Sequence, residues 1–115
     1  MSREYWFREG CFITELHNDA ADAGLSVARA RVEPGMTTRW HRLTGITERY
    51  LILSGQGRVE VGIAPPRDVQ ADDRVVIPPD TRQRITNTGS DDLIFLAICT
   101  PRFLPQAYVD LGDID

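Results

Sequence analysis

Short segments of alternating apolar and polar residues recur along this chain, about 8–12 residues apart, with glycine, proline, asparagine or aspartate between them. A clear example is LSVARARV, residues 25–32, which ends before Pro34-Gly35. Successive side chains of a strand point to opposite faces, so this alternation is typical of short strands with one face in a core. The other strands that we expect cover residues 11–17, 37–43, 48–55, 55–62, 74–79, 82–87 and 92–101.

About eight short strands joined by turns predict an all-β fold, either an antiparallel sandwich or a barrel. We expect residues 44–47 to form a four-residue hairpin loop and the GQG segment at 55–57 to form another hairpin turn. Only the C-terminal stretch LPQAYVDLGDID has room for a helical turn, and its acidic end is expected to fray. The single expected domain consists of an N-terminal arm and strand (1–24), a barrel core (25–101) and a C-terminal tail (102–115).

The composition excludes several classes of function. Acidic residues outnumber basic ones by 17 to 13, for a net charge of −4, so nucleic acid is not an expected partner. Every basic residue is arginine, which excludes a mechanism based on a lysine amine. The chain shows neither a signal peptide nor a segment of membrane-spanning length, so we expect a cytoplasmic protein with no membrane partner. Cys11 and Cys99 are far apart and are expected to be buried, reduced thiols.

Two sets of residues resemble the paired motifs of the cupins, a family of jelly-roll barrels. Gly35, His41, Glu48 and Gly55 stand at the spacings of the first motif, with Leu43 in place of its second histidine. Pro78 and Asn87 match the second motif, whereas Asp72, Asp80 and Gln83 replace its two glycines and its histidine. The resemblance covers about residues 25–101 and implies a small bacterial cupin, an antiparallel jelly-roll β-barrel with a small-molecule pocket inside.

The resemblance also implies where a divalent metal would bind. Carried over to this chain, the cupin ligand positions hold His41, Glu48 and Gln83, and Leu43 supplies no donor atom. An imidazole, a carboxylate and an amide oxygen make a weak site for a dication such as Mn, Fe, Ni or Zn. The first hypothesis is therefore a metal-dependent enzyme, of dioxygenase or isomerase type, that acts on a small polar or anionic substrate.

Two hypotheses do without a metal. In a proton-transfer enzyme, burial would raise the pKa of Glu48, which would exchange protons with His41, while Tyr50 serves as an acid. In a ligand-binding or sensor module, Arg39 would hold a small anion at the mouth of the barrel, and Tyr50 and Leu43 would line the pocket.

The sequence also predicts a homodimer. The segments LIL at 51–53 and IFLAIC at 94–99 are apolar on both faces, more than one small barrel can cover. A second subunit, with the N-terminal YWF at 5–7 packed across, would cover the outer face. The alternative is that the chain's own N-terminal strand covers it.

Overall fold

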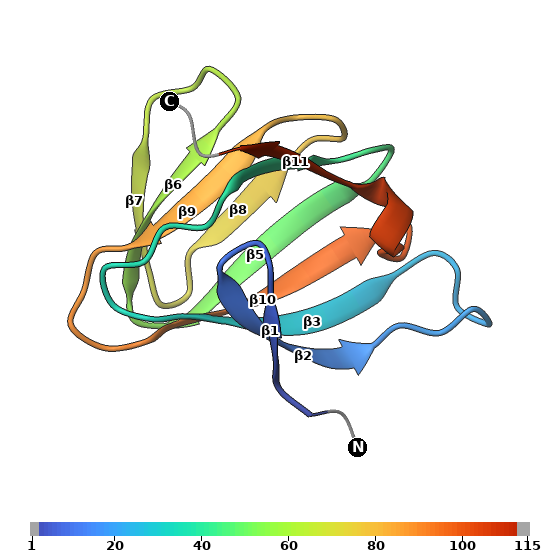
Figure 1. Ribbon diagram of the computed structural model, residues 1–115, viewed down its shortest axis with the longest axis horizontal. Coiled ribbons are helices and arrows are strands. Elements are labelled where there is room, and N and C mark those ends of the chain that lie inside the picture. Colours follow the sequence, from blue (N-terminus) through green and yellow to red (C-terminus); the bar gives the residue numbers. More distant parts are fainter. Residues whose placement is uncertain (1–2, 113–115) are drawn as a thin grey trace.

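A computed structural model describes residues 3–112, which form two antiparallel β-sheets that face each other (Figure 1). The six-stranded sheet consists, in spatial order, of β1 (Tyr5–Phe7), β2 (Cys11–His17), β3 (Ser26–Val32), β10 (Leu93–Thr100), β5 (Thr47–Ser54) and β8 (Arg74–Ile77). The five-stranded sheet consists of β11 (Tyr108–Gly112), β4 (Trp40–Leu43), β9 (Gln83–Asn87), β6 (Gln56–Val61) and β7 (Arg67–Gln70). The predicted all-β, antiparallel jelly-roll fold is confirmed.

Three strands, β1, β7 and β11, were not predicted from the sequence, and all three lie at the edge of a sheet. An edge strand has a neighbour on one side only and buries less of its surface, so its apolar alternation is weak. The helical turn expected near the C-terminus is present as a short 3-10 turn, η1 (Pro105–Ala107), but β11 follows it. The predicted fraying of the acidic end concerns residues 113–115, which lie outside the described residues. No helix within residues 3–112 has the length and apolar character needed to cross a membrane.

The predicted hairpin at residues 44–47 is wrong, because β4 and β5 belong to different sheets. The loop carries the chain across the barrel: the backbone N–H of Thr44 donates to Ala107, and that of Gly45 donates to the side chain of Asp80. Leu43 and Glu48 are therefore not opposite each other in a ladder. Both are buried and line one cavity between the sheets, so they converge across the interior rather than along one sheet.

The GQG segment is also not a hairpin, because it leads from β5 in one sheet to β6 in the other. Gly55 makes this bend with a φ of +90°, a conformation that glycine adopts without steric cost. A Cβ at this position would lie 2.6 Å from the carbonyl oxygen of Asp92 and 2.9 Å from the Cα of Leu93. The close approach of these two backbones requires glycine.

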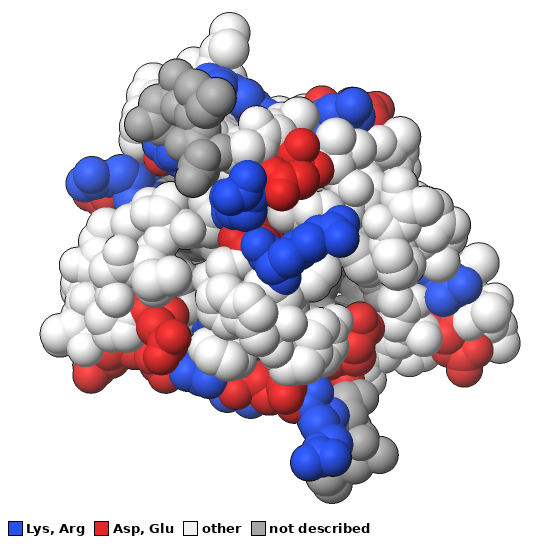
Figure 2. Space-filling model, viewed as in Figure 1, with Lys and Arg blue, Asp and Glu red and all other residues white. Residues whose placement is uncertain are grey.

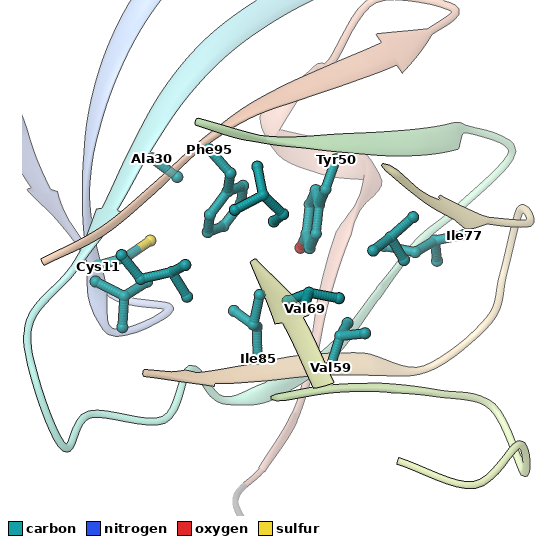
Figure 3. Packing of buried hydrophobic residues seen from close by; sticks show 12 residues of the cluster. Cys11, Ala30, Tyr50, Val59, Val69, Ile77, Ile85 and Phe95 are labelled. Carbon is teal, nitrogen blue, oxygen red and sulfur yellow. The ribbon is translucent and has the colours of Figure 1, made fainter. Parts of the chain in front are cut away.

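The core lies between the two sheets, where side chains from both point toward each other (Figure 3). The rings of Tyr50 and Phe95 pack at 4.4 Å between centroids. A second, smaller apolar cluster lies around Leu43 and Tyr108. Cys11 and Cys99 are buried and unpaired, as predicted. The main cluster consists of Cys11, Ala30, Val32, Tyr50, Ile52, Val59, Val69, Val75, Ile77, Ile85, Leu93 and Phe95.

Replacing Gly55 by alanine should lower the free energy of unfolding by at least about 2 kcal/mol, because the new Cβ meets backbone atoms in a left-handed conformation. Gly24→Ala is the matched control, since a Cβ there meets nothing within 4 Å. Urea titrations of both variants measure the difference. Equal stability of the two variants would contradict this account of the bend.

Candidate functional site

A cavity of about 60 Å³ lies inside the barrel, between the two apolar clusters. This is room for a few water molecules or for one functional group of a ligand. The lining combines apolar walls with a few polar side chains and holds no arginine. Its polar members are Glu9, Glu15, Ser26, His41, Glu48, Tyr50, Cys99 and Tyr108, and its apolar members are Phe7, Ile13, Ala28, Ala30, Leu43, Phe95, Ala97 and Phe103.

An outer groove lies beside the cavity, and the two share part of their walls. Glu15 and Phe103 line both the cavity and an outer groove of about 370 Å³. The groove is completed by residues 16–18 of the first long strand and its following turn, and by residues 102–105 before η1.

His41 and Gln83 are direct partners in the register of β4 and β9, and Glu48 reaches the same space from β5 in the opposite sheet. Each of the three is buried because it occupies an inward-facing position of its strand. The three residues that the cupin resemblance singled out as ligand positions are thus brought to one region of the barrel interior.

Glu48 receives a directed chain of hydrogen bonds. The Tyr50 hydroxyl donates to Oε1 of Gln83 at 2.6 Å, and Nε2 of Gln83 donates to Oε1 of Glu48 at 2.7 Å. The thiol of Cys99 lies 4.0 Å from the other carboxylate oxygen. Burial raises the pKa of Glu48 to about 7, and the charge of Glu9 adds to this, while His41 and Gln83 oppose it. Burial also raises the pKa of Tyr50 well above its usual value, so Tyr50 remains a neutral donor.

His41 is held on both sides of its imidazole. Nδ1 lies 2.7 Å from the carbonyl oxygen of Arg39, which only accepts hydrogen bonds, so Nδ1 carries a proton. Nε2, the other ring nitrogen, lies 3.2 Å from Oε1 of Glu9, within hydrogen-bond distance. The ring stacks on Tyr108, with centroids 5.2 Å apart and an interplanar angle of 20°.

Sequence reasoning missed Glu9 and Tyr108. Glu9 lies in the turn between β1 and β2, where the thiol of Cys11 donates to its carboxylate at 3.6 Å. The sequence could have indicated Glu9. It lies two residues before Cys11 and four before Ile13, so all three would point to the same inner face of an extended chain. Tyr108 comes from β11, in a tail whose composition gives no sign of a strand.

Of the residues expected to bind substrate, Leu43 and Tyr50 line the cavity and Arg39 does not. The guanidinium of Arg39 donates to the carboxylate of Asp110 at 2.9 Å and is more than one-third exposed. It lies on a polar outer cleft together with Arg8 and Arg84. Figure 2 shows arginine side chains next to acidic ones across the face of the molecule turned to the viewer.

A family model described as a cupin domain matches residues 28–99, well over half of the chain. The chain belongs to the cupin family. None of the curated proteins matches this cupin in sequence. It is similar to Streptomyces Pac13, a nucleoside dehydratase whose structures include complexes with uridine. The identity is 21%, the TM-score 0.82, and the match covers 99% of this chain and 88% of Pac13.

Two other solved cupins illustrate the range of the fold. The formate complex of Lactobacillus farciminis oxalate decarboxylase is 22% identical, with a TM-score of 0.81 over 96% of this chain and 33% of that one. KdgF from a Halomonas species is 15% identical, with a TM-score of 0.77 over 88% of this chain and 89% of that one. At such identities the likeness shows the fold alone.

The donor set of this cupin does not fit a divalent metal. A dication needs converging lone pairs, yet Nε2 of His41, the nitrogen that the Nδ1 hydrogen bond leaves for a ligand, lies 3.2 Å from Oε1 of Glu9. The amide oxygen of Gln83 accepts from Tyr50, and its nitrogen faces Glu48. Within residues 3–112, no group of three or more His, Cys, Asp or Glu side chains is placed to hold a metal ion. No chemical step proposed below runs through a metal.

Burial of Glu48 should make the protein less stable as the pH rises. The pKa of Glu48 in the folded state, about 7, exceeds its value of 4.5 in the unfolded chain. The folded protein therefore keeps a proton that the unfolded chain loses, and stability falls between about pH 4.5 and 7. The loss attributable to this group is roughly 3 kcal/mol. Urea unfolding at pH 5 and pH 8 should show it in the wild type, and Glu48→Gln should lack this component. The same decline in both proteins would contradict the burial of an ionisable carboxyl.

Proposed function

We propose that this cupin is a metal-independent acid–base enzyme that moves protons within a neutral, hydroxylated small molecule. The observation that carries the proposal is that two sets of acid–base side chains line one cavity inside the barrel. One is the pair of Glu9 and His41, whose Oε1 and Nε2 lie 3.2 Å apart, and the other is Glu48. Two titratable centres with different environments are the usual arrangement for an acid and a base that act in turn.

The surroundings of each centre suit its role. The hydrogen bond from Nδ1 to Arg39 fixes the His41 tautomer, so Nε2 is the nitrogen that exchanges a proton with a ligand. The Glu9 carboxylate lies on this same nitrogen, so Nε2 and Glu9 act toward a ligand as one acid–base unit. Because the pKa of Glu48 is about 7, both its protonated and its ionised forms are populated at neutral pH. Glu48 can therefore donate or accept.

These groups support elimination of water or isomerisation. In an elimination, one centre removes a proton from carbon, the electron pair of that C–H bond forms a double bond, and the neighbouring C–O bond breaks. The second centre protonates the departing hydroxyl, which leaves as water. In an isomerisation, the second centre returns the proton to a neighbouring atom. Neither reaction needs an oxidant or a reductant.

The lining of the cavity favours a neutral substrate. It includes three carboxyl side chains, Glu9, Glu15 and Glu48, and no arginine. An anionic group placed there would be repelled and would lose its hydration without gaining an arginine partner. Of the polar or anionic substrates expected from the sequence, we therefore propose the neutral ones. The fold shared with a nucleoside dehydratase and its uridine complexes supports a nucleoside-like or sugar-like molecule.

Two other functions predict different results. A metal-dependent dioxygenase or isomerase would lose activity to a chelator and regain it with Mn, Fe, Ni or Zn. A ligand-binding or sensor module would bind a small molecule without turnover and would tolerate Glu48→Gln. The convergence of ionisable groups favours the acid–base enzyme, since a binding site gains nothing from a carboxyl with a pKa near neutrality.

Incubation of the wild type with nucleosides and sugars in D₂O should give carbon-bound deuterium or loss of water, detected by NMR and mass spectrometry. His41→Gln should lower the rate about 10²–10⁴-fold, because it removes a general acid or base. Glu9→Gln should lower it less, while a chelator and the exposed control Asp68→Asn should change nothing. Binding without exchange in the wild type would favour the sensor, and inhibition by the chelator would favour a metal enzyme.

We also propose that the protein is a homodimer that pairs through the outer face of the six-stranded sheet. Leu51 and Leu96 are register partners on that face, and Leu53 and Val76 are 43% and 57% exposed on it. The sheet order argues against the alternative that the chain's own N-terminal strand covers this face, because β1 extends the sheet at its edge beside β2. A second copy is the proposed cover for these apolar side chains.

Sedimentation at micromolar concentration should show the wild type as a dimer. The double variant Leu53→Glu/Val76→Glu should be a folded monomer, because charges on this face oppose its burial. Ile63→Glu is the matched control, since Ile63 is fully exposed in the turn after β6 and lies outside the proposed interface. A monomeric wild type would defeat the proposal, as would dissociation by Ile63→Glu alone.

A further inference from the structure

The hydroxyl of Tyr108 is buried and has no hydrogen-bond partner among the described residues. Tyr108 as a whole is only 7% exposed, and it lines the cavity. Buried hydroxyls nearly always have a partner in folded proteins, because one without a partner has lost its hydration without compensation. A ligand in the cavity, or the water that it displaces, is the natural acceptor for this hydroxyl.

Packing fixes the position of the Tyr108 ring. One contact is with His41, stacked at 5.2 Å between centroids, and another is with Phe7, edge-on at 5.1 Å. The guanidinium of Arg8 lies 5.0 Å from the centre of the same ring. The ladder between β11 and β4 sets the backbone, with Tyr108 opposite Leu43. A side chain held from several directions presents its polar end in one place, which is the property of a binding residue.

Two comparisons within the molecule distinguish this hydroxyl from others. Tyr50 lines the same cavity, but its hydroxyl is committed to Gln83 at 2.6 Å. The indole N–H of Trp40 is also buried without a partner, but Trp40 does not line the cavity, and its ring lies against the guanidiniums of Arg82 and Arg84. Within residues 3–112, Tyr108 is therefore the one cavity-lining residue with an unpartnered, buried side-chain oxygen or nitrogen.

We propose that Tyr108 is a specificity-determining residue whose hydroxyl donates a hydrogen bond to a neutral acceptor oxygen of the substrate, a carbonyl or a hydroxyl, beside the imidazole of His41. The inference rests on the proposed function and narrows its substrate class to molecules with such an oxygen next to the reacting carbon. Burial, together with the charges of Glu9 and Asp110, raises the pKa of Tyr108. The phenol is therefore a neutral donor, and these same charges disfavour a carboxylate or phosphate as its acceptor.

The test compares Tyr108→Phe with Tyr50→Phe, using uridine as the probe. Tyr108→Phe should melt at the same temperature as the wild type or slightly higher, because it removes a buried hydroxyl that has no internal partner. Tyr50→Phe should melt lower, since it leaves the Gln83 amide oxygen without its donor. Calorimetric titration with uridine should show about 3- to 10-fold weaker binding to Tyr108→Phe than to the wild type, the range expected for one neutral hydrogen bond.

The outcomes separate this inference from the proposed function. Equal uridine affinity of the wild type and Tyr108→Phe would overturn the hydrogen bond while leaving the proposed function in place. Loss of thermal stability in Tyr108→Phe comparable to that in Tyr50→Phe would show an internal partner and would also overturn the inference. A wild type that does not bind uridine would overturn the nucleoside-like substrate class and, with it, the hydrogen bond to that substrate.

Discussion

Glu48 is buried between two sheets, and its carboxyl depends on the amide N–H that Gln83 donates at 2.7 Å. An unpaired carboxylate inside a barrel would be costly, so the neighbouring buried side chains must supply hydrogen-bond donors to it. Tyr50 orients the amide of Gln83 by donating to its oxygen, which leaves the nitrogen facing Glu48. These hydrogen bonds do not fully offset the loss of hydration, so the pKa of Glu48 still rises to about 7. A buried carboxyl without such donors would have a higher pKa.

The same arrangement supports the proposed acid–base chemistry over metal binding. At the position of one motif histidine, Leu43 contributes an apolar wall, and at another, Gln83 contributes an amide that is already bonded at both ends. The remaining histidine, His41, is paired with Glu9 instead of with converging ligands. Under the proposed function, these replacements suit the interior to proton exchange, while the cupin fold is retained.

Both ends of the chain complete the site. The turn between β1 and β2 brings Glu9 to Nε2 of His41, and β11 brings Tyr108 onto the opposite part of the same imidazole. Both β1 and β11 are edge strands, attached by one ladder each, and neither lies in the segment matched by the family model. Two residues that contact His41, Glu9 and Tyr108, thus come from outside the segment matched by the family model.

The sequence by itself determined the all-β fold and the inward positions of His41, Glu48 and Gln83. Successive side chains of a strand point to opposite faces, so the spacing of residues along the chain is enough to predict which of them share a face. It did not determine which strands are neighbours: the predicted pairing of β4 with β5 was wrong, and the three residues meet across the barrel instead. The contacts of His41 with Glu9 and Tyr108 join positions 32 and 67 residues away in the chain. Such contacts depend on how whole sheets face each other, so only the tertiary structure decided them.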